Sequence, residues 1–294
     1  MSSDSAELIR QVRKIEIKTR GLSSELFAGR YHSAFRGRGM AFSEVREYRP
    51  GDDVRDIDWN VTARSRKPHV KVYEEERELT MMLLADVSPS GAFGTVAKNK
   101  RTVITEIAAV LAFSASENND KVGCLLFSDR VEKFVPPKKG RQHVLSIIRE
   151  LLDFTAEGTG TDLSVPVAYL TNALKKRCTA FLLSDFIAPE SSYDSFEDAL
   201  RIASGKHDMV ALKIYDPRDA VVPDIGPAEF RDAETGLKLW VDTSSRSVRE
   251  AYAGYRSRCD SRADGILKRC RVDSAAIPTD EDYVKSLIKL FKRR

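Results

Sequence analysis

Three oxygen-bearing side chains follow one apolar run at alternate positions. Residues 79–85 are apolar enough for a strand buried on both faces, and Asp86, Ser88 and Ser90 come directly after it. A loop with side chains at i, i+2 and i+4 can turn all three toward one point. Carboxylate and hydroxyl oxygens are hard donors that suit Mg²⁺ or Mn²⁺. This D-x-S-x-S pattern therefore predicts a metal-binding loop.

Two later segments offer further donors of the same kind. Gly160-Thr161-Asp162 precedes an expected helix, and Asp185 follows the apolar run 179–183. Ligands in open α/β sheets sit outside the carboxyl ends of the strands, so we expect these side chains to meet Asp86 at one edge. Thr161 is the expected threonine ligand, and Thr159 is the open alternative. The competing interpretation is an ordinary sheet edge without metal, because a strand-terminal Asp often only caps a helix.

The elements that position these residues alternate from residue 79 onward. The sequence predicts a mainly parallel sheet flanked by helices, which is an α/β fold. Strands are expected at 79–85, 121–127, 131–135, 179–183 and 209–215, and helices at 99–117, 141–153, 163–176 and 192–204. Beyond them we expect a β-hairpin within 227–242 and helices at 245–270 and 280–292.

The chain is expected to divide into three parts, residues 1–78, 79–244 and 245–294. The first part combines a helix at 7–20 with a small region of irregular loops and short strands that is rich in Arg, Gly and Asp. Its interleaved charges suggest an ion-pair network that packs on the sheet domain, with Trp59 as an apolar anchor. The loop Arg36-Gly37-Arg38-Gly39 is open between a structural role and a candidate partner-binding role. The last part is expected to be a helical extension.

Composition narrows the classes of function. Hydrophobic residues are 42% and charged residues 31% of the chain, as in an ordinary globular protein. The net charge of +4, from 48 basic and 44 acidic residues, argues against a dedicated nucleic-acid binder. The four cysteines form no C-x-x-C pair, so we expect no zinc site. This use of cysteine fits a reducing cytoplasm, where we expect the protein to be located. No apolar stretch reaches the ~18 residues of a membrane span, so membrane association would come through a partner.

The set of D-x-S-x-S, Gly-Thr loop and strand-terminal Asp resembles the metal-ion-dependent adhesion site of von Willebrand factor A (vWA) domains. The resemblance implies a Rossmann-like vWA domain over 79–244. It also implies that Ser88 and Ser90 bind the metal directly, and that Thr161 binds it directly in one state and through water in another. Asp86 and Asp185 would hold waters and orient the hydroxyls. A coordination position would stay open for a Glu or Asp of a partner protein.

The segment before the first strand of this domain carries a second resemblance. It contains G-x-G at 37–39, R-x-Y at 46–48, P-G-D-D-x-R at 50–55 and I-D-W at 57–59. With the vWA strand that follows, it resembles the bacterial family catalogued as domain of unknown function 58, over about residues 25–245. The resemblance implies a partnership with a MoxR-type AAA+ ATPase or its client, in an adaptor or chaperone-like role.

Two other functions compete with an interaction module. The first is a Mg²⁺-dependent phosphotransferase or hydrolase that uses Asp86, but Ser88 and Ser90 stand where several acidic ligands are usual. The sequence contains no G-x-x-x-x-G-K-[ST], G-x-S-x-G or H-E-x-x-H, so we expect no enzyme activity. The second is nucleic-acid binding through Arg30, the Arg36–Gly39 loop and the basic C-terminal helix, and the interleaved acids weaken it.

Overall fold

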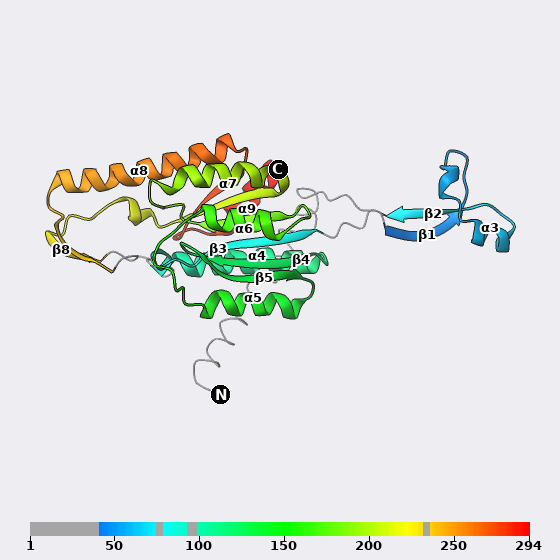
Figure 1. Cartoon of the computed structure of the whole chain (residues 1–294), viewed down its shortest axis with the longest axis horizontal. Coiled ribbons are helices and arrows are strands. Elements are labelled where there is room, and N and C mark those ends of the chain that lie inside the picture. The colour runs from blue at the N-terminus through cyan, green and yellow to red at the C-terminus, as the bar shows by residue number, and fades with distance from the viewer. Residues whose placement is uncertain (1–40, 75–78, 93–98, 232–235) are drawn as a thin grey trace, which may run out of the picture. The chain divides into compact units, whose positions relative to one another are not determined.

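The computed structural model describes residues 41–74, 79–92, 99–231 and 236–294 (Figure 1). These residues fall into two compact units, which divide between Leu79 and Thr80. The predicted helix at 7–20 and the Arg36–Gly39 loop lie outside the described residues.

A six-stranded sheet forms the centre of the larger unit. Its order is β10-β7-β6-β3-β4-β5, and all neighbours are parallel except β4 and β5, which are antiparallel. The strands are β3 (Thr80–Asp86), β4 (Lys121–Phe127), β5 (Val131–Lys138), β6 (Thr179–Ser184), β7 (Asp208–Tyr215) and β10 (Asp273–Pro278). The mainly parallel sheet is confirmed. The chain winds outward from β3 in both directions, so the switch in strand order falls between β3 and β6, where open α/β sheets bind ligands.

Helices cover both faces of this sheet, as Figure 1 shows. They are α4 (Lys100–Glu117), α5 (Arg141–Asp153), α6 (Ser164–Ala173), α7 (Ser192–Lys206), α8 (Arg246–Arg269) and α9 (Tyr283–Arg293). On one face, Met82 and Leu84 of β3 share a core with residues of α6, α7 and α8. On the other face, the Phe181 ring of β6 meets the Phe291 ring of α9 edge-on, with centroids 6.4 Å apart. Within the described residues, no helix combines the length and apolarity that a membrane span requires.

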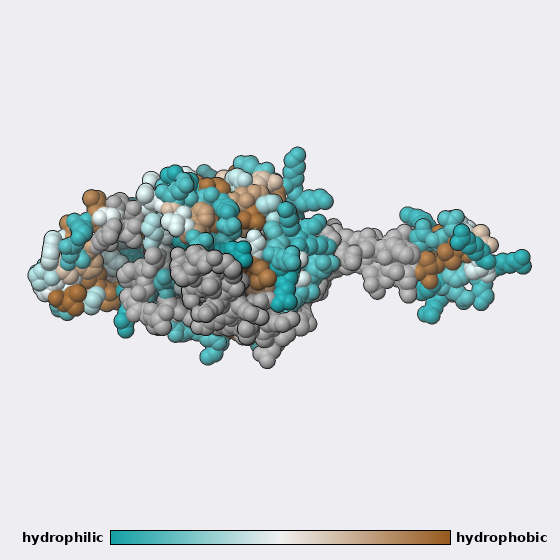
Figure 2. Space-filling view, turned by 90° about the horizontal axis from the view of Figure 1, so that it is seen from below, coloured by the Kyte–Doolittle hydropathy of each residue, from teal (hydrophilic) through white to brown (hydrophobic). Residues whose placement is uncertain are grey.

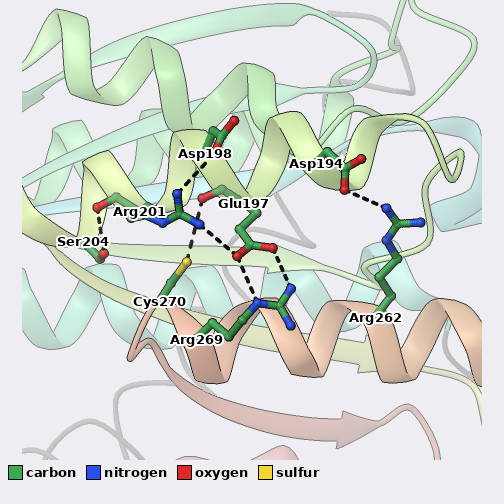
Figure 3. Close-up of polar contacts among 8 residues, drawn as sticks. All are labelled: Asp194, Glu197, Asp198, Arg201, Ser204, Arg262, Arg269 and Cys270. Atoms are coloured by element: carbon green, nitrogen blue, oxygen red, sulfur yellow. Dashed lines mark hydrogen bonds and ion pairs between the residues drawn. The ribbon is translucent and has the colours of Figure 1, made fainter.

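Ion pairs join α7 to α8, which lie side by side (Figure 3). The Arg269 guanidinium donates two hydrogen bonds to the Glu197 carboxylate, at 2.9 and 2.5 Å. Arg201 donates to the same carboxylate at 3.0 Å, and Arg262 donates to Asp194 at 2.7 Å. These pairs are largely solvent-exposed, so they orient the two helices more than they stabilise them. The buried apolar contacts beneath them hold α8 on the sheet unit.

The C-terminal part differs from its predicted helical character in one element. Residues 273–278 form β10, which pairs in parallel with β7 at the edge of the sheet. The segment Asp-Ser-Ala-Ala-Ile-Pro has weak strand propensity, and its pairing with β7 overrides that local preference. Helix α9 then buries Leu287, Leu290 and Phe291. The predicted extension over 245–294 is therefore part of the sheet unit and not a purely helical addition.

A β-hairpin was expected within 227–242, and the structure confirms it. Strands β8 (Pro227–Arg231) and β9 (Lys238–Asp242) pair antiparallel. Leu237, Leu239 and Trp240 are 71%, 65% and 70% exposed. Figure 2 shows apolar surface at the end of the sheet unit that carries this hairpin. Adjacent exposed apolar side chains of this size are typical of contact surfaces.

The smaller unit contains an antiparallel pair of strands, β1 (Ala41–Glu47) and β2 (His69–Glu74), with a 3-10 turn (Val54–Asp56) and helix α3 (Trp59–Ser65) between them. The Arg46 guanidinium donates to both oxygens of Asp52, at 2.8 and 2.7 Å, and both side chains are partly exposed. Trp59 is 69% exposed, so it is not buried against the described residues of this unit. The predicted ion pairs are therefore surface pairs here. The predicted packing on the sheet domain stays a prediction.

Candidate metal centre

The D-x-S-x-S loop begins at the last residue of β3. The Asp86 Oδ1 atom accepts a hydrogen bond of 2.9 Å from the Ser88 amide, which is the turn that an Asp side chain makes with the backbone two residues on. Residues Pro89–Ala92 then form a short 3-10 turn. As a result the Ser88 and Ser90 hydroxyl oxygens lie 3.0 Å apart. The structure thus brings together the three side chains that the sequence singled out here.

The end of β6 supplies the next part of the site. The Ser184 hydroxyl donates to Asp86 Oδ2 at 2.6 Å and accepts from the Phe186 amide at 3.0 Å. Asp185 Oδ1 accepts from the Ile187 amide at 3.1 Å. Phe186 has a positive φ of 58°, so the chain turns sharply directly after Asp185. Asp86 and Asp185 are both buried, at the ends of neighbouring strands.

The Gly-Thr loop is tied to the same edge through the end of β4. The Val87 amide donates to the Phe127 carbonyl at 2.8 Å, and the Asp162 amide donates to the Ser128 carbonyl at 3.0 Å. Val87 precedes Ser88 and Asp162 follows Thr161, and their two partners, Phe127 and Ser128, are consecutive residues at the end of β4. The two loops are therefore held next to each other at this edge of the sheet. Thr161 is buried, whereas Thr159 is exposed. Burial at this edge favours Thr161 as the threonine of the site.

Glu132 on β5 fixes the conformation of this loop, and it was not predicted from the sequence. Its carboxylate accepts hydrogen bonds from the Gly158 amide at 2.8 Å, the Glu157 amide at 3.2 Å and the Ser128 hydroxyl at 2.6 Å. A Cβ atom on Gly158 would lie 2.1 Å from Ser128 Oγ and 2.2 Å from Asp129 Oδ1. A side chain at position 158 would have to displace Ser128 and Asp129, so glycine lets the loop pass close to the turn between β4 and β5.

Lys100, the first residue of α4, is a second residue of this edge that was not predicted from the sequence. Its Nζ atom lies 2.8 Å from Asp185 Oδ2 and 2.8 Å from Asp219 Oδ2. The three side chains are 5%, 4% and 8% exposed. Asp219 belongs to a 3-10 turn, η3 (Pro217–Ala220), that follows β7. The sequence offers only a weak signal for this lysine, its place in the first turn of a helix, because a lysine there is normally solvated.

The charges of the site are unevenly compensated. Burial, together with the neighbouring Asp185 carboxylate, raises the pKa of Asp86 to about 6, against the hydrogen bonds from Ser184 and Ser88. Burial by itself would lower the pKa of Lys100, but its two carboxylate partners hold it above the ordinary value. The Arg101 guanidinium interacts electrostatically with Asp86, while donating to the Phe154 carbonyl. Asp86, Asp185 and Asp219 against two cations leave a formal excess of one negative charge.

These residues fit a small divalent ion. Two neighbouring ligands of octahedral Mg²⁺, each at 2.0–2.1 Å, are about 2.9 Å apart. The Ser88 and Ser90 hydroxyl oxygens, at 3.0 Å, match that separation. Among the described residues, no three His, Cys, Asp or Glu side chains are arranged to hold a metal. An ion at this edge would therefore depend on hydroxyl ligands, with the buried carboxylates behind them.

A cysteine–histidine pair at another place in the sheet unit has a structural character. Cys178 Sγ lies 3.3 Å from His207 Nδ1, and both residues are buried. Burial raises the pKa of Cys178 to about 12, so the thiol stays protonated at neutral pH. This pair does not form an activated nucleophile. The other three cysteines are free and buried as well, as expected of reduced core cysteines.

The doubly wound sheet, with a D-x-S-x-S loop at the switch in strand order, defines a vWA-like domain. A family model described as "Protein of unknown function DUF58" matches residues 44–262. This chain belongs to that family. The resemblance noted from the segment before β3 is thereby confirmed.

Relatives and solved structures with some similarity to this chain also exist. An uncharacterized protein of Mycobacterium tuberculosis is 30% identical in an alignment of 297 positions, which covers 99% of this chain and 91% of that protein. The conserved hypothetical protein BatB from Bacteroides thetaiotaomicron is 14% identical over 73% of this chain and 98% of its own, with a TM-score of 0.49. The VWA domain of SpRpn10 is 12% identical over 74% and 96%, with a TM-score of 0.37. Both scores are below 0.5, so the strand order itself defines the fold.

Proposed function

We propose that this chain is a metal-dependent protein-interaction module that takes a carboxylate of a partner protein. The observation that carries the proposal is the Ser88–Ser90 hydroxyl pair, 3.0 Å apart beside the buried carboxylate of Asp86. Ser88, Ser90 and Thr161 would hold Mg²⁺ or Mn²⁺, and Asp86 and Asp185 would orient them from behind. The ion, when bound, would supply a coordination position for a hard anionic oxygen.

The buried carboxylates of the site already have hydrogen-bond or ion-pair partners within the protein, which supports the binding of an external anion to the metal ion. The Asp86 oxygens accept from the Ser88 amide and the Ser184 hydroxyl, and Asp185 is paired with Lys100. The remaining side chains that could bind the metal ion directly are neutral hydroxyls, which do little to neutralise a divalent cation. A Glu or Asp of another protein would therefore gain a strong charge-assisted bond, and one residue could dominate the interface.

The partner we propose is a MoxR-type AAA+ ATPase or its client, with this chain in an adaptor or chaperone-like role. Membership of the DUF58 family supports this proposal. The exposed apolar hairpin β8–β9 supports an interaction role more generally.

An enzyme that uses Asp86 as a nucleophile is less well supported. Its carboxylate is buried, and each of its oxygens already accepts a hydrogen bond. A substrate phosphate or acyl group would have to displace Ser184 or the Ser88 amide to reach it. The raised pKa of Asp86 further lowers the share of the reactive carboxylate form below pH 6. These features suit a residue that orients others.

A binding assay with purified partner tests the proposal. We expect binding in Mg²⁺ that is lost in EDTA and in Ser90→Ala, and weakened in Thr161→Ala. Thr159→Ala is the matched control, because Thr159 is the exposed threonine of the same loop and should bind normally. Undiminished binding in EDTA and in both site variants would show that the partner binds to another surface of the protein. The Arg36–Gly39 loop, the C-terminal helices and the β8–β9 hairpin would then be examined by substitution.

A further inference from the structure

Lys100 occupies a position that disfavours a cation in two ways. It is the first residue of α4, which is fixed there by its N-cap Asn99, whose Oδ1 accepts from the Thr102 amide at 2.8 Å. The first turn of a helix carries partial positive charge and normally favours acidic side chains. Lys100 is also almost completely buried, and burial of an ammonium group is costly. Residues that break such local rules and are compensated from elsewhere tend to mark functional places.

The compensation comes from two carboxylates on different strand ends. Asp185 follows β6 and belongs to the proposed metal site, whereas Asp219 follows β7 and does not. The Lys100 ammonium lies 2.8 Å from an oxygen of each. It can therefore weaken its hold on Asp185 without losing all countercharge, because Asp219 continues to pair with it. This is the arrangement expected of a cation that shares a carboxylate with a second, exchangeable cation.

We propose that Lys100 is a built-in competitor of the metal ion, a positioning residue that neutralises Asp185 in the metal-free protein and lowers the affinity of the site. The inference rests on the proposed function, since it assumes that Asp185 serves a metal. An ammonium group in direct contact with Asp185 repels a divalent ion and cancels the charge that would attract it. The same contact stabilises the metal-free fold, because Asp86 and Asp185 would otherwise face each other with less compensation. The site would accordingly bind metal weakly by itself and more tightly when a partner's carboxylate adds its own charge.

Mn²⁺ affinity, measured by the electron paramagnetic resonance of free Mn²⁺, separates competition from simple structural support. Lys100→Met removes the charge and should tighten Mn²⁺ binding by at least about tenfold. Asp219→Asn leaves the whole ammonium charge to Asp185 and should weaken binding several-fold. The double variant Lys100→Met/Asp219→Asn keeps the net charge of the wild type but frees Asp185, so it should still bind more tightly than wild type. Lys175→Met removes an exposed lysine that precedes β6, at the opposite edge of the sheet, and should change affinity less than about twofold.

Thermal unfolding gives a second readout. In EDTA, Lys100→Met should melt below wild type, and Mn²⁺ should restore more of its stability than it adds to wild type. The double variant lacks the uncompensated Asp219 carboxylate, so it decides the question if Lys100→Met does not fold. Tighter binding that disappears when Ser88→Ala is added supports the proposal, including when the wild type binds too weakly to measure.

Two other results overturn the inference in distinguishable ways. If the wild type binds Mn²⁺ and the two variants that lack Lys100 bind it no more tightly than the wild type, then Lys100 supports the site and does not compete with the metal. The proposed function then stands. If no variant binds Mn²⁺ at millimolar concentration, the proposed metal site fails and the inference fails with it.

Discussion

Replacement of Asp86 by Asn should stabilise the metal-free protein at alkaline pH. The Asp86 carboxylate is buried beside Asp185, and its pKa is raised from 3.8 to about 6. An acid with a raised pKa binds its proton more tightly in the folded state than in the unfolded state. Its stabilising contribution is therefore present below pH 4 and is lost as the pH rises through about 6. Above that pH the ionised carboxylate destabilises the fold.

The magnitude follows from the size of the shift. About two pKa units correspond to about 3 kcal/mol of destabilisation at pH 8. Asn keeps an acceptor for the Ser88 amide, but it places an amide group where Ser184 now donates at 2.6 Å. The rearranged hydrogen bond costs about 1 kcal/mol. The net gain is about 1–2 kcal/mol, or roughly 3–6 °C in melting temperature for a unit of this size.

Thermal and urea unfolding in EDTA at pH 8 and pH 4.5 measure this effect. The advantage of Asp86→Asn over wild type should shrink by about 2 kcal/mol between the two pH values. Asp185→Asn is the matched control, because it removes one of the two carboxylates that pair with Lys100. It should destabilise by about 1–3 kcal/mol. A destabilised Asp86→Asn at pH 8, or a gain that does not change with pH, would refute the reasoning.

Two further predictions concern the elements that support the site. Gly158→Ala should lower the Mn²⁺ affinity about tenfold and the stability by about 1–3 kcal/mol, because its Cβ would meet Ser128 and Asp129. Gly205→Ala is the control: a Cβ at this position of α7 points into open space, so the variant should be neutral or stabilising. Calorimetry on both variants checks this, and normal metal binding by Gly158→Ala would contradict it. Truncation after Cys270 should abolish cooperative unfolding of the sheet unit, because it removes β10 and the buried residues of α9; a sharp, wild-type-like melting curve would show that the extension is dispensable.

The sequence alone determined the elements whose signals are local. Helix α5 begins and ends where its apolar spacing predicts, at Arg141–Asp153, and the strands buried on both faces coincide with unbroken apolar runs. The hydroxyl pair of the site was predictable for the same reason. Asp86, Ser88 and Ser90 stand at alternate positions, with one residue between each, so one turn, closed by the Asp86 side chain itself, brings them together.

Tertiary structure decided which distant side chains complete the site. Ser184 reaches Asp86 because β6 is the neighbour of β3, and Lys100 reaches Asp185 and Asp219 because the ends of β6 and β7 converge near the start of α4. Strand β10 could not be predicted from the sequence either, because its residues have weak strand propensity and form a strand only by pairing with the open edge of β7. A hydrogen bond or ion pair between distant residues leaves no periodic trace in the chain. The compensation of buried charge, and with it the control of the proposed metal site, is therefore a property of the folded arrangement alone.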